Sequence, residues 1–448
     1  MSIHQQLPVK RNEFLHSLDE DEFENSVDET FLLDSSVSAC SLDTSVKTWS
    51  DFKGIHYHPR STVLVPENGD FTRHCSEMEQ IEETIRFFAE ECDSMQGYHI
   101  VSDLRSCFGT LATAVLEYLE DEYKSKTRFS FPTLSVLPPG GATSSPSELL
   151  SHVLNMAGTL QLSDLTVPLS VCSDVVKSGR TRTFPHLVYD SAKSYHTSAI
   201  LACGLESFAR SYRRRPMKLT MDDVIQTVTP GSRTLASFNL ALPFSHTEDC
   251  TDALRDFSDA LPWQSLTPGV ELGNRDTFHC FSHCATLCGF PQPNSLCAAR
   301  FDARDCCSRK TDKDFLRFYL QEKLLPDRLD VTLTGEPVKL RKPFPHIFSS
   351  AVQPDGRIHL KAPKLENLSF ENSDLSSLPD NVALSQVSSV PVLASLESST
   401  AANGLLKQYR TCATSLKRWT SQSCHSDVVS QLVEALERMH TIEEYYFF

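Results

Sequence analysis

The chain of 448 residues is long enough for two or three domains, each with its own core. Hydrophobic residues make up 40% and charged residues 22%, the balance of a soluble globular protein, and no run approaches the ~18 apolar residues that span a bilayer. The net charge of −16 argues against nucleic acid or anionic lipid as the main partner, because both attract basic surfaces.

Residues 1–45 are expected to form a disordered acidic arm, because the run Asp19–Glu22 lies among few residues that could build a core. This arm is either a solvated tail or an element that folds on a partner. The opening MSIHQQLPVKRNEF has neither the apolar centre of a secretory signal nor the basic character of a mitochondrial presequence. We therefore expect a cytosolic protein, and the 15 scattered cysteines are read as reduced thiols.

Over residues 46–240, helical and strand patterns alternate, which predicts a parallel α/β sheet. The expected strands are Tyr98–Ser102, Arg128–Val136 and Val167–Val171. A helix with a capping box at Ser76 and Glu79 precedes the first strand, and a helix that ends near Tyr123 follows it. A helix that begins at Ser145–Glu148 and ends at Gly158 follows the second strand, and a long helix at Tyr195–Tyr212 follows the third.

The second half of the chain is less regular, and residues 241–365 are predicted to form an α+β domain. Its expected strands include Asp330–Leu333 and Gly356–Leu360. Residues 366–403, with a Ser-rich stretch from Ser369 to Ser399, predict a flexible segment. A C-terminal helical segment over residues 404–448 completes the chain.

The turn between the strand at Tyr98–Ser102 and the following helix is where nucleotide-binding α/β domains carry a glycine-rich phosphate loop. Here the turn reads DLRSCFG, with Gly109 as its one glycine, in a chain that has only 16 glycines.

This stretch resembles tubulin. The matching residues are Cys92-Asp93, Gln96-Gly97-Tyr98, Leu104, Glu122-Tyr123 and the later segment Asn239–Phe244. The resemblance implies a tubulin/FtsZ-like α/β fold, in which an incomplete Rossmann-like, nucleotide-binding-type domain is followed by an α+β second domain and C-terminal helices. The long helix at Tyr195–Tyr212 would be the central helix of that fold.

A narrower resemblance, to the tubulin-like Misato family, rests on segments that run from residue 46 to residue 419: VKTWSDF, HPRS, EECDSMQG, YHTSAIL, PFPHIFSS and KRW. It implies a role in mitochondrial distribution, morphology, fusion and inheritance. The expected location is the cytoplasm and the cytosolic face of the outer membrane, with protein partners at that surface, peripheral membrane association at most and no nucleic acid. Because family members begin with a further tubulin-like segment, we expect the leading strand to be missing from the sheet.

Compared with the tubulin loop GGGTGSG, the turn of this chain has lost its glycine cradle. Phe108 and Leu111 are bulky where the backbone must approach phosphate, although Arg105 could still pair with an anion. We interpret the loop as degenerate; the alternative is an altered but working nucleotide site. Asp222-Asp223 are expected to start a helix at Asp222–Gln226 rather than to hydrolyse a nucleotide. We therefore predict no GTPase activity, no cofactor, and no catalytic, cofactor-binding or metal-binding residue.

One cluster is rich in metal-ligand side chains, and it consists of His279, Cys280, His283, Cys284 and Cys288, followed by Cys297 and Cys306-Cys307. The spacing lacks the repeated C-x-x-C of zinc sites. We expect a helix with the first three cysteines on one buried face. The alternative is a zinc-containing interaction module. Arg213–Arg215 is read as a solvated helix end, or else as a site for an acidic partner.

Overall fold

The computed structural model describes residues 58, 60–66, 75–134, 145–172, 181–213, 219–244, 250–255, 257, 261–270, 278–290, 311–340, 344–358, 384–423 and 426–447. The expected acidic arm, together with Cys297 and Cys306-Cys307, lies outside these ranges.

A small parallel sheet is built from the first half of the chain. Its strands follow the order β1 (Gly97–Asp103), β2 (Thr127–Thr133) and β3 (Leu165–Thr166). Three helices alternate with them, and these are α2 (Ser76–Glu90), α3 (Cys107–Glu122) and α4 (Pro146–Leu162). Parallel strands need such crossover helices because a tight turn cannot join them. The expected parallel α/β arrangement is confirmed.

Of the predicted helix boundaries, the start of α4 is confirmed, whereas the capping box of α2 and the end of α4 are not. The capping box of α4 is present, with Ser145 accepting from the Glu148 amide and Glu148 accepting from the Ser145 amide. The box at Ser76 was wrong, because Cys75 is the N-cap and gives no side-chain cap. Gly158 does not end α4. A Cβ atom there would lie 2.8 Å from the Thr113 methyl group, so this glycine lets α4 pack closely on α3.

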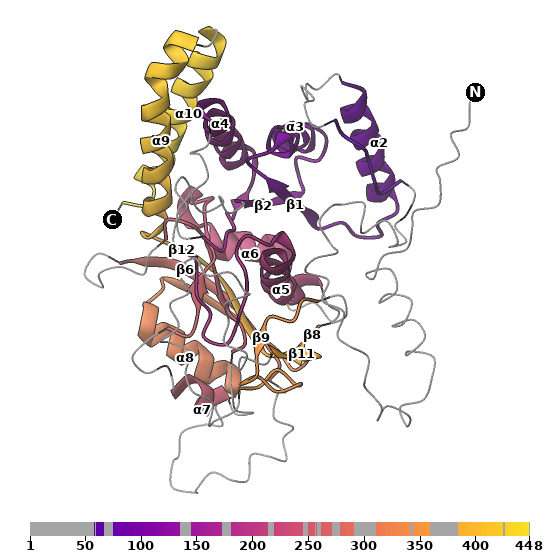
Figure 1. Ribbon diagram of the computed structural model, residues 1–448, viewed down its shortest axis with the longest axis vertical. Coiled ribbons are helices and arrows are strands. Elements are labelled where there is room, and N and C mark those ends of the chain that lie inside the picture. The colour runs from indigo at the N-terminus through magenta and orange to yellow at the C-terminus, as the bar shows by residue number, and fades with distance from the viewer. Residues whose placement is uncertain are drawn as a thin grey trace, which may run out of the picture.

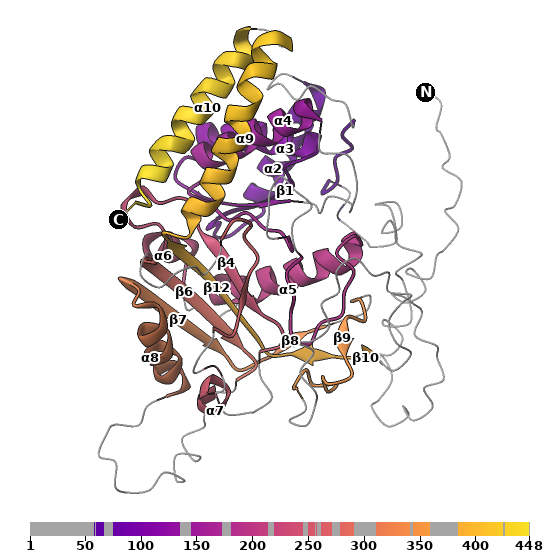
Figure 2. The same cartoon turned by 60° about the vertical axis from the view of Figure 1, so that its left-hand side comes forward.

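The long helix α5 (Ser194–Arg213) lies between this three-stranded sheet and the larger, five-stranded sheet (Figure 2). Its buried side chains face the larger sheet, as the sequence pattern required. Its end is tied to the small sheet, because Tyr212 Oη lies 3.0 Å from His99 Nε2 on β1. The Gln96 side chain donates to the Tyr212 carbonyl and accepts from the Met221 amide at the start of α6 (Met221–Val228).

The larger sheet has five strands in the order β5 (Gln264–Ser265), β4 (Ser237–Ala241), β12 (Val392–Ser399), β6 (Cys280–Cys288) and β7 (Arg328–Thr334). Its neighbours are antiparallel except β6 and β7. Helices α5 and α6 cover one face, while α7 (Cys250–Arg255) and α8 (Asp312–Leu324) lie on the other (Figure 1). We call this second face the outer face.

The predicted flexible segment at residues 366–403 was wrong for its last part. Strand β12 lies at the centre of the larger sheet, and all eight of its residues are buried. It is flanked by β4 and β6, which supply both rows of hydrogen bonds. Serine content does not indicate a flexible segment here, because Ser395, Ser398 and Ser399 are buried in the strand rather than solvated.

The helix predicted through the cysteine cluster was also wrong, because Cys280–Cys288 is strand β6. A spacing of four residues repeats on one face of a strand as well as on a helix, and a strand buried on both faces shows no alternation. Cys284 and Cys288 pack in the core beneath α5. Cys280 lies in the core beside α8, beyond a register shift opposite Ser398 and Ser399. All three are buried, as the core-packing interpretation requires.

Two small sheets and two helices complete the described structure. The small sheets pair β8 (Val338–Lys339) with β11 (Ser389–Val390), and β9 (Phe348–Ser349) with β10 (Leu384–Ser385). A short 3-10 turn, η2, spans Pro230–Ser232. The expected strand at Gly356–Leu360 is reduced, in the described part, to one bridge between Val352 and Ile358.

Helices α9 (Ala402–Ser423) and α10 (Ser426–Glu444) lie side by side and pack against α4 (Figures 1 and 2). The hydroxyl of the buried Tyr446 anchors the end of this pair, because it donates to the Leu235 carbonyl and accepts from the Leu235 amide. None of the helices in the described ranges is both long enough and apolar enough to cross a membrane.

Candidate functional site: the turn between β1 and α3

The turn that leads from β1 into α3 occupies the place of the phosphate loop. Its amides are directed at the chain itself: Arg105 N donates to Asp103 Oδ1 at 3.1 Å, and Phe108 N donates to Ser106 Oγ at 3.3 Å. Gly109 N donates to the Ser106 carbonyl, and Leu104 N donates to the Thr133 carbonyl. In a phosphate-binding turn such donors are left for the anion. Here Ser106, the N-cap of α3, replaces it.

The one glycine of the turn serves helix packing. A Cβ atom on Gly109 would lie 2.4 Å from Asn155 Nδ2 of α4. The Asn155 amide donates to the Leu104 carbonyl and accepts from the Thr110 hydroxyl, each at 3.3 Å. This side chain therefore fastens the turn to α4, and it needs a residue without a side chain at position 109.

Arg105, the residue of the turn that could still have paired with an anion, lies close enough to His152 of α4 and Tyr409 of α9 to act on the pKa of both. His152 and Tyr409 are hydrogen-bonded to each other at 2.9 Å. Burial, reinforced by the positive charge of Arg105, lowers the pKa of His152 to about 3. Burial also raises the pKa of Tyr409 well above its usual range. The pair is thus neutral at physiological pH, and the turn is coupled to the C-terminal helices.

The two bulky residues of the turn region behave differently. Leu111 is buried and packs against Met78 of α2 and Ala114, so α2 covers the first half of α3. Phe108 is 50% exposed at the first turn of the helix. Phe108 is therefore exposed at the start of α3, whereas Leu111 is directed into the contact with α2.

The start of α6 is the region in which tubulins carry residues for nucleotide hydrolysis. Asp223 forms a capping box with Thr220, and Asp222 accepts from Gln226 Nε2 at 2.7 Å. Both carboxylates therefore serve the helix, as predicted, and the helix extends over Met221–Val228 rather than ending at Gln226.

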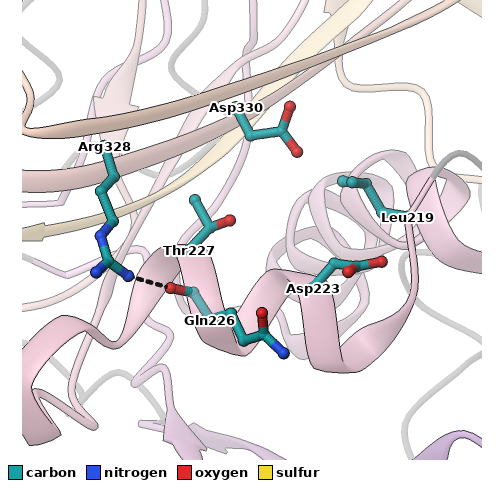
Figure 3. A pocket seen from close by; sticks show the side chains of 6 residues that line it. All are labelled: Leu219, Asp223, Gln226, Thr227, Arg328 and Asp330. Carbon is teal, nitrogen blue, oxygen red and sulfur yellow. Dashed lines mark hydrogen bonds between the residues drawn. The ribbon is translucent and has the colours of Figure 1, made fainter.

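A cavity of about 510 Å³ lies between α6 and β7 (Figure 3). Its polar groups are engaged within the chain. Arg328 Nη1 donates to the Gln226 carbonyl at 2.6 Å, and Asp330 Oδ1 accepts from the Val331 amide at 2.8 Å. Asp223, which also lines it, is the capping residue of α6. The cavity is a polar groove whose charges already hold the secondary structure.

A buried polar cluster on the outer face of the larger sheet was not foreseen. Glu397 of β12 lies directly opposite His283 of β6, with Oε2 and Nδ1 3.7 Å apart. Asn239 of β4 donates to the same oxygen at 3.1 Å, and the Trp263 ring lies 5.6 Å from the imidazole. His283 was considered only as a metal ligand. The signal for Glu397 was a single acid within the otherwise apolar and small run VLASLESS.

The β6 cysteines have little character of a metal site. Burial raises the pKa of both Cys280 and Cys284 far above its ordinary value, which keeps the thiols protonated. Within the described ranges, no three His, Cys, Asp or Glu side chains are grouped as a metal ion would need.

Comparison with known proteins agrees with this architecture. A family model described as a tubulin domain matches residues 39–213. Protein misato homolog 1 of Danio rerio is 30% identical and aligns with 99% of this chain and 80% of the relative. The Bos taurus homologue is 26% identical, over 90% of this chain and 71% of the relative. Protein misato of Drosophila melanogaster is 28% identical, over 70% of this chain and 59% of the relative.

The molecule is therefore a tubulin-like α/β protein, in which a nucleotide-binding-type sheet precedes an α+β half and C-terminal helices. More narrowly, the chain belongs to the Misato family.

Proposed function

We propose that this Misato-family protein is a non-enzymatic, tubulin-like protein that regulates mitochondrial distribution, morphology, fusion and inheritance. It acts from the cytosolic face of the outer membrane, through protein partners and without a nucleotide. The organelle role rests on the family resemblance. The net charge of −16 favours a protein receptor over anionic lipid.

The observation that carries the non-enzymatic part is the self-capped turn. Ser106 and Asp103 accept the amide hydrogens that a phosphate would need, and Asn155 occupies the space beside Gly109. A nucleotide would have to break these contacts before it gained any of its own, which subtracts directly from its affinity.

Titration with a fluorescent GTP analogue tests this part. We expect no saturable binding at micromolar nucleotide and no turnover, for the wild type and for Arg105→Ala alike. Saturable binding that GDP competes away, and that Arg105→Ala weakens, would overturn the proposal and favour a GTP-binding tubulin relative.

A rescue experiment tests the cellular part. Depletion of the endogenous protein should fragment or cluster mitochondria before any loss of microtubules.

Phe108→Asp puts a negative charge at the start of α3, where it repels an anion but suits the helix dipole. Phe318→Asp is the matched control, since Phe318 is 64% exposed on α8. We expect both variants to rescue like the wild type. Failure of Phe108→Asp alone would indicate an anion site at the turn.

The location is tested on intact mitochondria. Added protease should digest the protein, and carbonate should release it, as for a peripheral protein. A matrix location, or microtubule loss that precedes the mitochondrial change, would overturn the organelle-surface role and indicate one in spindle or microtubule organisation.

A further inference from the structure

Helix α9 has an unusual charge balance for this protein. Its 22 residues, ANGLLKQYRTCATSLKRWTSQS, contain four basic residues and no acid, although 58 of the 448 residues of the chain are acidic. Lys407 and Lys417 are exposed. Lys407 and Lys417 therefore place positive charge on the surface of a strongly negative molecule.

This surface is hollowed. A cavity of about 420 Å³ is lined by Lys407, Arg410, Thr411, Thr414 and Ser415, all from α9. We call this the α9 groove. The exposed ring of Phe447 lies near Lys407, with its centroid 5.9 Å from Nζ.

The groove holds its cations in place. Arg410 is paired with the buried carboxylate of Glu443 on α10, which fixes the guanidinium beside the groove. The hydroxyls of Thr411 and Thr414 donate to the Lys407 and Arg410 carbonyls, each at 2.8 Å. They therefore present oxygen lone pairs and small methyl groups, and Lys407 is the lining cation whose charge Glu443 does not already balance.

We propose that the α9 groove binds an acidic, extended segment of a partner protein. Lys417 does not line the groove, but it is exposed on the same helix ten residues beyond Lys407, about 15 Å along the helix axis. That span is too long for one phosphate group but matches about five residues of extended peptide. This inference gives the chemistry of the partner that the proposed function requires, and it rests on that function only in this respect.

A membrane surface fits the groove less well. Lipid-binding helices combine basic residues with a broad apolar face, whereas the exposed positions of α9 that line the groove are Lys, Thr and Ser. The rest of the molecule is acidic and would be repelled by anionic lipid.

The test measures the fluorescence anisotropy of a labelled peptide of about ten residues, in which Asp and Glu alternate with Ser, against the full chain. A peptide with Asn and Gln in place of the acids is the ligand control. Lys407→Glu/Lys417→Glu should weaken binding about tenfold or more and remove most of its salt dependence. Lys313→Glu/Lys339→Glu makes the same charge change at two exposed sites elsewhere and should leave binding within about twofold.

Three results would overturn the proposal. One is equal binding to both double variants. Another is binding of phosphatidylserine vesicles, lost in Lys407→Glu/Lys417→Glu, without binding of the acidic peptide. The third is a large gain in peptide affinity when Asp19–Glu22 are changed to Asn and Gln in the full chain, because the groove would then serve the protein's own acidic run. The assay contains neither nucleotide nor mitochondria, so its failure is distinct from failure of the proposed function.

Discussion

Polar groups are satisfied in opposite ways in two regions of the molecule, the turn between β1 and α3 and the outer face of the larger sheet. At the turn, which has the position of a ligand site, Asp103 and Ser106 engage the backbone through local contacts, and Asn155 engages it from α4. In the sheet, an acid, an imidazole and an amide are buried together and depend on strands far apart in sequence.

The difference shows that the position of a ligand site in a related fold does not determine where the loss of a polar contact would lower the stability most. The turn can lose one contact and replace it with water, because it lies near the surface. The pair Glu397 and His283 is almost fully buried, so neither side chain can turn to solvent. We therefore expect stability to be most sensitive in the sheet and least sensitive in the capped turn.

The largest effect is expected for Glu397→Ala. It removes the acceptor of Asn239 and leaves His283 buried without its neighbour, which should lower the free energy of unfolding by about 3–5 kcal/mol. Urea denaturation followed by circular dichroism measures it. Glu397→Gln keeps an acceptor oxygen for Asn239 and should cost less than half as much. Because Gln also keeps nearly the volume of Glu, equal losses in the two variants would mean that the carboxylate itself, and not the hydrogen bond to Asn239 or the packing, matters here.

The next effect concerns the interior behind the turn and depends on pH. The pKa of His152 is lowered from 6.5 to about 3 in the folded state by burial and by Arg105. Between these values the unfolded chain binds a proton that the folded chain does not, so stability falls as pH falls. From about pH 7 to pH 4 this group should contribute a loss of roughly 3 kcal/mol.

His152→Gln provides the comparison for that measurement. It keeps an acceptor for the Tyr409 hydroxyl but cannot titrate, so its unfolding free energy should depend less steeply on pH than that of the wild type. Parallel curves for the two proteins over this range would show that His152 titrates normally.

A smaller effect is expected for Gly109→Ala. The new Cβ would overlap Asn155 and approach the Leu104 carbonyl at 3.0 Å, which costs about 1–3 kcal/mol. Alanine gains up to about 1 kcal/mol of helix propensity, so we expect a net loss of about 1–2 kcal/mol. Gly158→Ala is the comparison: its Cβ would lie 2.8 Å from the methyl group and 3.3 Å from the hydroxyl of Thr113, whereas the Cβ at position 109 also approaches a backbone carbonyl, so Gly158→Ala should cost less.

An element of the fold could be predicted from the sequence when the contacts that determine it are local. The α4 capping box and the start of α6 were predicted correctly, because each is encoded within four residues. Strands β6 and β12 were missed, since each is buried on both faces, which leaves no period to detect, and the two strands pair across more than 100 residues of sequence. The tubulin-like fold came from the motifs, not from periodicity.

The candidate site was also predicted only in part. The loss of the glycine cradle was visible in DLRSCFG, but the contacts that now occupy its place were not. Nothing in the sequence pairs Gly109 with Asn155, or brings Arg105 towards His152 and Tyr409, because these contacts cross from α3 to α4 and α9. The cluster around Glu397 joins three strands and could not be predicted from any one of them.

The smallest effect is expected for Ser106→Ala in the capped turn. The variant removes the acceptor of the Phe108 amide, and loss of an N-cap costs about 1 kcal/mol. Ser145→Ala removes the equivalent acceptor in α4 and should cost about the same. If Ser106 caps the helix and has no ligand role, both variants should shift the urea midpoint alike, and neither should gain or lose GTP binding. Saturable GTP binding in Ser106→Ala alone would mean that its hydroxyl blocks a site otherwise able to hold phosphate. The turn would then be a nucleotide site closed by one side chain, and the contrast with the buried cluster of the sheet would no longer hold.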